Sequence, residues 1–267
     1  MAQEPEEPLV EEEDGGPIKP FLDHLEDLRW VLIKCISATI IGMSLCMAGA
    51  PYVVKFLQKP LPSTMRLEML GPLDGFWISV KVGLFAGLIL ALPYMLYVIG
   101  EFVLPALKRT EKKYFLHAVT IGAGLFLAGA TLCYFVMLPI SLGAVVKFNA
   151  WLGIASTFWR ANAYFSFVCW FIVGMGLSFE MPVILLTLVK LDIISHKTLI
   201  KSRRYFVVIN LVVCSFITPD FVSTFFMILP MQVLFEICIL ISAYWERQKK
   251  RAEAALLTTQ EPQNVSD

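Results

Sequence analysis

The sequence predicts an all-α membrane protein of six transmembrane helices, kinked and cupped, with both chain ends in the cytoplasm. Three observations lead to this fold class: the apolar composition, the length of the apolar runs and the distribution of basic residues between them. Hydrophobic residues make up 57% of the 267 residues and charged residues 16%, against about 45–50% and about 25% in soluble domains. The net charge is zero, so the composition gives no indication of nucleic-acid binding.

Six apolar runs account for the predicted spans, because a transmembrane helix needs about 20 predominantly apolar residues. The first four runs cover residues 31–50, 76–99, 114–138 and 164–189. The fifth run is short and covers residues 205–217, and the sixth covers residues 224–245. Only a few residues around Thr218, Pro219 and Asp220 separate the last two runs. A connection that short predicts two antiparallel neighbouring helices.

The basic residues predict the orientation of these helices. With the N-terminus inside, the cytoplasmic segments carry about three times as many lysines and arginines as the outside segments. The inside set is Lys19, Arg29, Lys34, Lys108, Arg109, Lys112, Lys113, Lys190, Lys197, Lys201, Arg203, Arg204, Arg247, Lys249, Lys250 and Arg251. The outside set is Lys55, Lys59, Arg66, Lys147 and Arg160, while Lys81 lies within a span. Because the excess repeats from loop to loop, it also predicts an even number of spans.

Proline residues predict that the helices are bent. Pro93, Pro182 and Pro230 lie inside the second, fourth and sixth runs. Each proline removes a backbone hydrogen bond and kinks its helix. Kinked helices favour a curved bundle with a concave face over a straight parallel bundle.

Three regions are predicted along the chain. Residues 1–20 are expected to form a disordered acidic cytoplasmic tail, because acidic residues, proline and glycine dominate this segment and an apolar leader is absent. Residues 21–245 form the transmembrane domain, and residues 246–267 form a C-terminal cytoplasmic tail. The 6 cysteines lie inside apolar runs without a CxxC pair and the 3 histidines are scattered, so no metal site is predicted.

Two acidic residues are predicted at depths where a charge is costly. Glu180 lies in the middle of the fourth run, and Glu236 lies in the sixth run, nearer the cytoplasmic headgroups. An acid at the bilayer centre costs about 3 kcal/mol on insertion scales, so such a group is usually protonated, paired or next to water. Glu180 is therefore interpreted either as an interhelical structural contact or as part of a polar cavity or binding surface.

A second polar group is predicted at the cytoplasmic membrane surface. Leucines recur every three residues before Arg29, which predicts a short amphipathic helix lying on the membrane, with Glu26 and Asp27 on or near its polar side. The loop after the second run places Glu101 and Glu111 among basic residues. The residue types of this loop, taken alone, also fit a solvated charged segment.

Six sequence blocks together resemble the TatC family, the core subunit of the twin-arginine protein translocase, over the stretch from about Phe21 to Tyr244. Residues 24–29 are similar to the family's His-Leu-x-Glu-Leu-Arg signature, and residues 93–111 resemble its first cytoplasmic loop. The other blocks are residues 164–183, 203–205, 218–220 and 230–236. The order of the blocks and their depth in a six-span frame make the resemblance specific.

The resemblance implies a function in the export of folded proteins. Family members bind signal peptides with a paired-arginine motif at the cytoplasmic face of the bacterial cytoplasmic (inner) membrane. They assemble with the single-span subunits TatA and TatB and with other TatC copies in the lipid bilayer, and the proton-motive force drives transport. The resemblance implies no catalytic residue, no bound cofactor and no metal, so an enzyme is not expected.

The resemblance also implies a signal-peptide site. By position, the family's signal-binding acids fall on Asp27 and Glu111, and carboxylates suit this role because arginine forms forked hydrogen bonds with them. Asp27 stands where the family usually has glutamate, so the neighbouring Glu26 is an alternative. Glu101 is unusual for the family and is a candidate extra acid, and Arg29 is expected to hold the acids in place.

Two further sites follow from the same resemblance. Glu180 matches the family's intramembrane acid, which faces the concave side of the bundle. The region that docks partner helices matches Thr218, Pro219, Asp220, Thr224, Gln232 and Glu236. Thr224 stands where many members have glutamine, which leaves the preference for partners open.

Two other functions fit part of the sequence. A proton-coupled small-solute transporter would use Glu180 as its ion site, but the two halves of the chain show no convincing internal repeat. An intramembrane enzyme would need a nucleophile with a base, or metal ligands at depth, and the sequence contains neither HExxH nor GxSxG. The favoured expectation is therefore a signal-peptide receptor and translocase scaffold.

Overall fold

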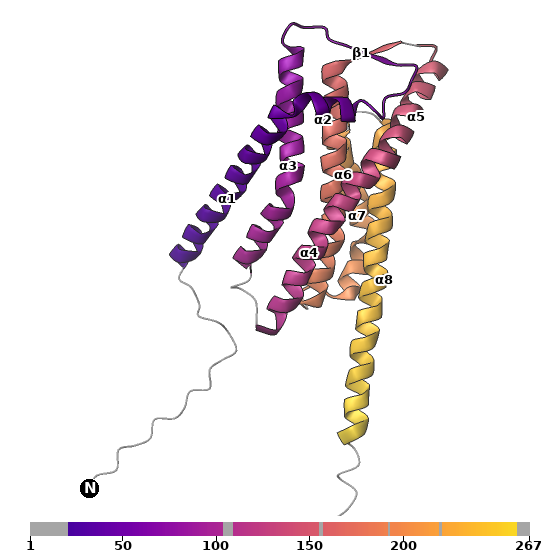
Figure 1. Cartoon of the computed structure of the whole chain (residues 1–267). Coiled ribbons are helices and arrows are strands. Elements are labelled where there is room, and N and C mark those ends of the chain that lie inside the picture. Colours follow the sequence, from indigo (N-terminus) through magenta and orange to yellow (C-terminus); the bar gives the residue numbers. More distant parts are fainter. Residues whose placement is uncertain (1–20, 104–108, 155–156, 192, 219–220, 261–267) are drawn as a thin grey trace, which may run out of the picture.

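The computed structural model describes residues 21–103, 109–154, 157–191, 193–218 and 221–260, which form an almost entirely helical bundle (Figure 1). The helices are α1 (Phe21–Ala48), α2 (Ala50–Leu57), α3 (Asp74–Val103), α4 (Arg109–Leu132), α5 (Leu138–Trp151), α6 (Ala161–Lys190), α7 (His196–Ile217) and α8 (Phe221–Gln260). A π-helical turn, η2 (Cys133–Met137), joins α4 to α5. Strands β1 (Arg66–Glu68) and β2 (Phe158–Arg160) pair in parallel.

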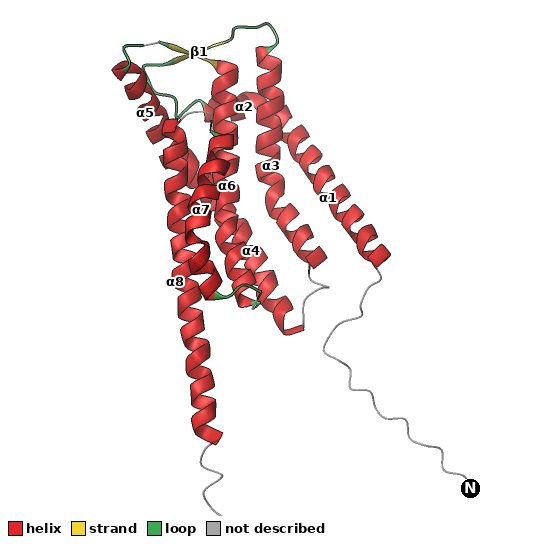
Figure 2. Ribbon diagram, turned by 180° about the vertical axis from the view of Figure 1, so that it is seen from behind, coloured by secondary structure: helices red, strands yellow, loops and turns green. Residues whose placement is uncertain are grey.

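The strands define the two ends of the bundle. Both lie at what we call the strand end, where α3 and α6 begin and α7 ends (Figure 2). At the opposite end, called the far end, α1 and α4 begin and α3 and α6 finish (Figure 1). The long helix α8 runs past the far end of the other helices (Figures 1 and 2).

Five helical stretches among the described residues are long and apolar enough to cross a membrane. They are His24–Ala48, Asp74–Val103, Tyr114–Trp151, Ala161–Lys190 and Phe221–Arg251. The helix α7 is not among them, because basic residues occupy its first turns. Its apolar part, residues 205–217, is about 20 Å long at about 1.5 Å per residue, which is short of a hydrocarbon core of about 30 Å. The six-span count and the orientation of the termini therefore stay predictions.

Several helices are longer than the apolar runs that predicted them. Residues 21–29 are the first turns of α1 and not a separate surface helix, because no helix breaker follows Arg29. The third run continues through η2 and α5 to Trp151. Pro139 has no N–H to donate to the preceding helical turn. The N–H of Leu138, just before it, donates to the carbonyl of Cys133, five residues back, which is the hydrogen bond of a π turn. The helix α8 likewise extends beyond residue 245 to Gln260.

The prolines lie inside continuous helices, as their positions within the apolar runs predicted. Pro93 is in the second half of α3, Pro182 is in α6 and Pro230 is in α8. Figures 1 and 2 show the part of α3 toward the far end bent toward α1, while α1 itself leans away from the rest of the bundle. The bundle is therefore splayed at its far end on the side of α1 and α3.

Two glycines set the packing of α1 on α3. A Cβ atom at Gly42 of α1 would lie 2.6 Å from the carbonyl oxygen of Gly87 in α3. A Cβ at Gly87 would in turn lie 2.6 Å from the carbonyl carbon of Gly42. The two backbones therefore touch at a point where no larger residue fits, as in the small-residue crossings of membrane helices.

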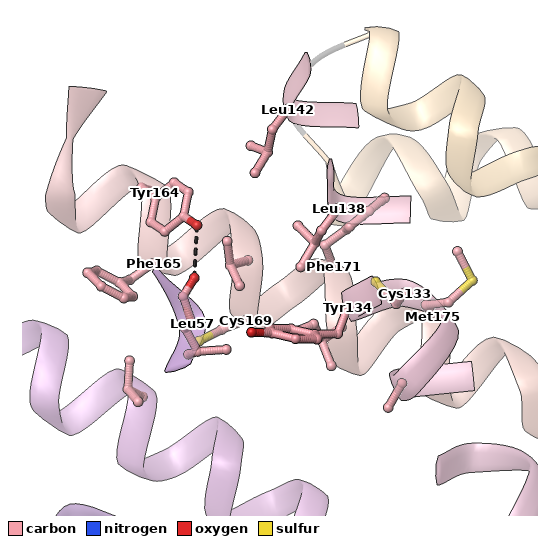
Figure 3. Close-up of a cluster of buried hydrophobic side chains, with 14 of the residues drawn as sticks. Leu57, Cys133, Tyr134, Leu138, Leu142, Tyr164, Phe165, Cys169, Phe171 and Met175 are labelled. Carbon is pink, nitrogen blue, oxygen red and sulfur yellow. Dashed lines mark hydrogen bonds between the residues drawn. The ribbon is translucent and has the colours of Figure 1, made fainter. Parts of the chain in front are cut away.

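The apolar core is centred on α6 and the rod formed by α4, η2 and α5. Phe165, Phe171 and Met175 of α6 pack there with Leu138 of α5 (Figure 3). Two tyrosine hydroxyls bind the last carbonyls of α2: Tyr164 donates to Leu57 at 2.9 Å (Figure 3) and Tyr134 donates to Phe56 at 2.7 Å. These bonds satisfy carbonyls that the end of a helix leaves without partners, so they fix α2 against the core.

Candidate functional site

The predicted signal-peptide acids lie at the far end of the bundle, on the splayed side. Glu26 and Arg29 are exposed in the second and third turns of α1, and Asp27 between them is half-buried. The ring of His24 stacks on the ring of Phe102 of α3, with centroids 4.5 Å apart. This contact holds the start of α1 against the end of α3.

The same contact brings a further acid, Glu101, close to the start of α1. Glu101 precedes Phe102 directly and its side chain is exposed. Glu111 lies in the first turn of α4, which begins at the same end of the bundle (Figure 1), although its side chain is outside the described part of the structure. The backbone positions of Glu26, Asp27, Glu101 and Glu111 therefore lie on three helix ends at the same, far end of the bundle.

Glu180 is a buried acid at the contact between α6 and α4. Its side chain is 7% exposed, and no described residue gives its Oε1 atom a hydrogen bond. Its Oε2 atom lies over Gly122 of α4, where a Cβ would be only 2.7 Å away. Gly122 thus leaves the space that the carboxylate occupies. A buried carboxylate oxygen without a donor is costly. Glu180 therefore packs between α6 and α4 without a hydrogen bond from any described residue to its Oε1 atom.

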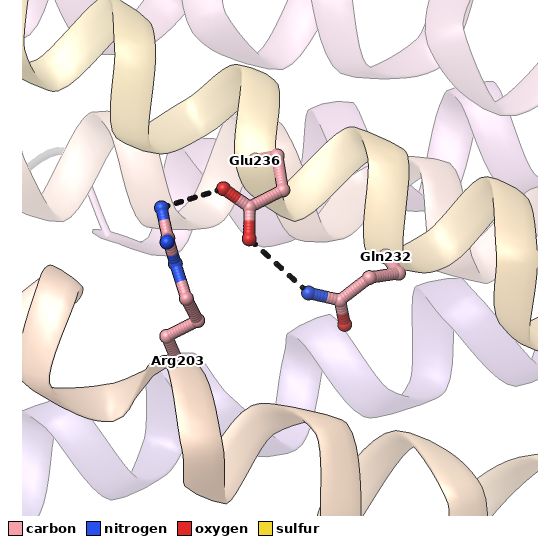
Figure 4. A network of polar contacts seen from close by, with 3 residues as sticks. All are labelled: Arg203, Gln232 and Glu236. Carbon is pink, nitrogen blue, oxygen red and sulfur yellow. Dashed lines mark hydrogen bonds and ion pairs between the residues drawn. The ribbon is translucent and has the colours of Figure 1, made fainter.

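Glu236 lies in a polar network between α7 and α8 (Figure 4). Arg203 of α7 donates to its Oε2 at 2.7 Å, and Gln232 donates to its Oε1 at 3.3 Å (Figure 4). The Arg203 and Glu236 side chains are 51% and 38% exposed, so a pair of this kind contributes about 1 kcal/mol or less. The Oε1 atom of Gln232 is buried and no described residue donates to it.

A second polar group in this helix pair lies toward the strand end. The hydroxyls of Thr218 and Thr224 are 2.7 Å apart, and the Thr218 hydroxyl also donates to the carbonyl of Cys214 at 2.9 Å. Ser141 of α5 and Ser223 of α8 are fully buried and hydrogen-bonded to each other. The predicted docking residues Pro219 and Asp220 lie outside the described residues. The rest of the predicted docking set is therefore split between two separate networks, one at the start of α8 and one farther along the same helix.

Sequence reasoning missed a polar network at the strand end between α3 and α6. Lys81 donates to Asn162 at 2.5 Å and to Ser166 at 2.7 Å. Asn162 donates to Asp74 at 3.4 Å, and Asp74 accepts the backbone N–H groups of Leu70 and Gly71. The only sequence signal was a lysine inside an apolar run, since its partners lie 81 and 85 residues away.

The fold and these polar groups define a multi-pass helical membrane protein, with a buried acid inside the bundle and acidic helix ends at one face. Residues 23–230 match the family described as Sec-independent protein translocase protein (TatC). The chain therefore belongs to the TatC family and is a component of the Sec-independent protein translocase of a bacterial membrane. This family consists of translocase components and is not a family of catalytic enzymes.

Named relatives and solved structures agree with this family. The TatC protein of Aquifex aeolicus is 33% identical over 239 residues, covering 88% of this chain and 100% of that protein. TatCd of Bacillus subtilis is 31% identical over 236 residues, covering 88% of this chain and 96% of that protein. A crystal structure of the twin-arginine translocase receptor TatC in DDM matches with a TM-score of 0.76 at 34% identity, covering 82% of this chain and 99% of that chain.

Proposed function

We propose that this chain binds twin-arginine signal peptides at its far end, which faces the cytoplasm together with both termini. The observation that carries the proposal is that three acid-bearing helix ends lie at the same end of the bundle, where the stack of His24 on Phe102 holds two of them together. The matched crystal structures are of twin-arginine translocase receptors, which supports the same role here.

The chemistry of recognition rests on charge and geometry. Two adjacent guanidinium groups stay ionised and present planar forks of donors, which carboxylates accept with two parallel hydrogen bonds. We assign this role to Asp27 and Glu111, with Glu26 and Glu101 as neighbouring acids. At the edge of a membrane the effective dielectric is lower than in water, so each charge-assisted bond is stronger than it would be on a soluble surface. Arg29, two residues after Asp27, is assigned to positioning these acids.

The proposal extends to single-span partners of the TatA and TatB type and to other TatC copies. The helices α7 and α8 expose large apolar side chains toward the strand end, including Phe216 at 88% and Phe221 at 83%. A partner helix that covers this face would lie beside the buried hydroxyls of Thr218 and Thr224 and, farther along α8, beside Gln232 and Glu236. Assembly with such partners, driven by the proton-motive force, is the transport step that we propose after recognition.

The first test is direct binding of a signal peptide. A fluorescent twin-arginine signal peptide is titrated against the purified chain in detergent, alongside the same peptide with both arginines replaced by lysine. We expect the arginine peptide to bind at least about 10-fold more tightly, because lysine is a point charge that cannot form the fork. Equal affinity for the two peptides would contradict the proposed recognition, and transport by this chain in cells lacking their own TatC then tests the translocase role separately.

A second prediction concerns the buried carboxylate. Glu180→Ala is expected to leave signal-peptide binding intact and to impair transport. Gly122→Ala is expected to have the same effect, because its methyl group would lie 2.7 Å from the Glu180 Oε2 atom and displace the carboxylate. We expect each variant to lower transport by about 10-fold, which corresponds to about 1.4 kcal/mol in the transport step.

The matched control is Gly124→Ala, two residues along the same helix. A Cβ at Gly124 meets no atom within 4 Å, so this variant adds the same methyl group into open space. It is expected to transport at the wild-type rate. Wild-type transport by Gly122→Ala would show that the position of the Glu180 carboxylate is irrelevant to transport.

A further inference from the structure

A polar cavity lies at the far end between α8 and the connection from α6 to α7. Its volume is about 670 Å³, within the range of about 300–1,000 Å³ typical of ligand pockets. Lys190 closes α6, His196 begins α7, and Lys249 and Lys250 belong to α8, so residues from three helices line the same space. None of the sites described above uses this cavity.

The lining of the cavity is basic. Lys190, Lys249 and Lys250 carry positive charge, and Glu246 is the single carboxylate among the described lining residues. Glu246 is paired with Lys250 at 2.8 Å, which leaves the lining with a net positive charge. The Nδ1 atom of His196 lies 3.2 Å from the hydroxyl of Ser242. The described lining residues include three lysines and one carboxylate, and this excess of positive charge around a cavity of this size favours an anionic ligand.

Aromatic side chains show the depth of the cavity in the membrane. The ammonium group of Lys190 lies over two rings, 5.2 Å from the centroid of Tyr114 in α4 and 5.2 Å from that of Trp245 in α8. Tryptophan and tyrosine gather at the level of lipid headgroups, and Lys190 is the last residue of a candidate span. About 20 residues of α8 fill the hydrocarbon core, which places Ser242 and the residues after it in the headgroup layer.

We propose that this cavity binds the headgroup of an anionic phospholipid such as phosphatidylglycerol. The phosphate would lie among Lys190, Lys249 and Lys250, and the acyl chains would leave between α6 and α8 into the bilayer. Basic pockets between membrane helices at the membrane surface bind phosphate-bearing headgroups in this way. Because every bacterial bilayer surface offers such lipids, the proposal does not depend on signal-peptide binding.

The test is a lipid titration of the delipidated full chain in detergent, followed by native mass spectrometry. Phosphatidylglycerol is compared with phosphatidylcholine, which has the same phosphate but no net charge. Each lysine near a membrane surface contributes about 5-fold in affinity for anionic lipid, so Lys249→Gln with Lys250→Gln should weaken phosphatidylglycerol binding by about 30-fold. Glu246→Gln removes one negative charge and should strengthen phosphatidylglycerol binding by about 5-fold. A merely structural role of these residues would not produce this effect.

The matched control is Lys55→Gln with Lys59→Gln, two exposed lysines at the other end of the molecule. This variant should bind phosphatidylglycerol like the wild type. Unchanged binding in the Lys249/Lys250 variant, or equal affinity of the wild type for the two lipids, would overturn the proposal. Displacement of the lipid by inorganic phosphate at an equal concentration would also overturn it, because the cavity would then be a site for free anions.

Discussion

Replacing Asp27 and Glu111 together by alanine is expected to weaken twin-arginine peptide binding by more than about 100-fold. Each carboxylate is assigned one charge-assisted contact worth about 1.5 kcal/mol or more, so Glu111→Ala alone should cost over about 10-fold. The measurement is the dissociation constant of the peptide at fixed, low salt, since screening weakens exposed charge pairs. Asp27→Glu keeps the charge and should retain most of the affinity.

A carboxylate at the strand end provides the control for this experiment. Glu68 in β1 is exposed and lies at the other end of the bundle from the proposed site. Glu68→Ala removes the same charge and should leave peptide affinity unchanged. Full affinity in the Asp27/Glu111 double variant would sink the assignment of these two acids, while loss of affinity in Glu68→Ala would point to a non-specific charge effect.

Gly87→Leu is expected to separate the far end of α1 from α3. A Cβ at this position would already lie 2.6 Å from the carbonyl carbon of Gly42, so a leucine cannot be accommodated by a change of rotamer. Overpacking of this kind costs about 1–3 kcal/mol or more. The neighbouring helices must then part, and the stack of His24 on Phe102 should be lost with the site that it holds together.

Chemical crosslinking measures this separation. His24→Cys and Phe102→Cys are introduced into an otherwise cysteine-free chain, and a short bifunctional thiol reagent then reports whether the two helix ends are adjacent. The Gly87→Leu variant should crosslink at least about 10-fold more slowly. A free-energy cost above about 1.4 kcal/mol for bringing the two helix ends together lowers the adjacent population by that factor. Gly143→Leu is the control, because a Cβ there meets nothing within 4 Å. Unchanged crosslinking in Gly87→Leu would show that the glycine contact does not position α1.

The sequence predicted the features that depend on local pattern. Helix locations followed from the apolar runs, because burial in lipid requires an apolar surface and satisfied backbone bonds over the whole span. The family followed from the order of its motifs. The ends of helices were less predictable: the run that ended at residue 138 did not reveal that a π turn before Pro139 carries the helix on to Trp151.

Contacts between distant residues were beyond the reach of sequence patterns. Glu180 was recognised as costly, yet nothing local indicated that Gly122, 58 positions earlier, makes room for its carboxylate. Lys81 was noticed only as a charge within a run, because Asn162 and Ser166 reach it from another helix. The cavity between α8 and the connection from α6 to α7 likewise combines three lysines whose spacing in the chain carries no recognisable motif.

The shortness of α7 has a mechanical consequence for the surrounding lipid. On the proposed topology, an apolar stretch of about 20 Å meets a hydrocarbon layer of about 30 Å, so lipid tails beside α7 must compress or the helix ends must draw headgroups inward. At a fraction of a kcal/mol per Å of mismatch, this elastic load amounts to a few kcal/mol. The bilayer next to α7 and α8 would then be thinner than elsewhere and elastically strained. This thinning would lie at the face where partner helices are proposed to assemble.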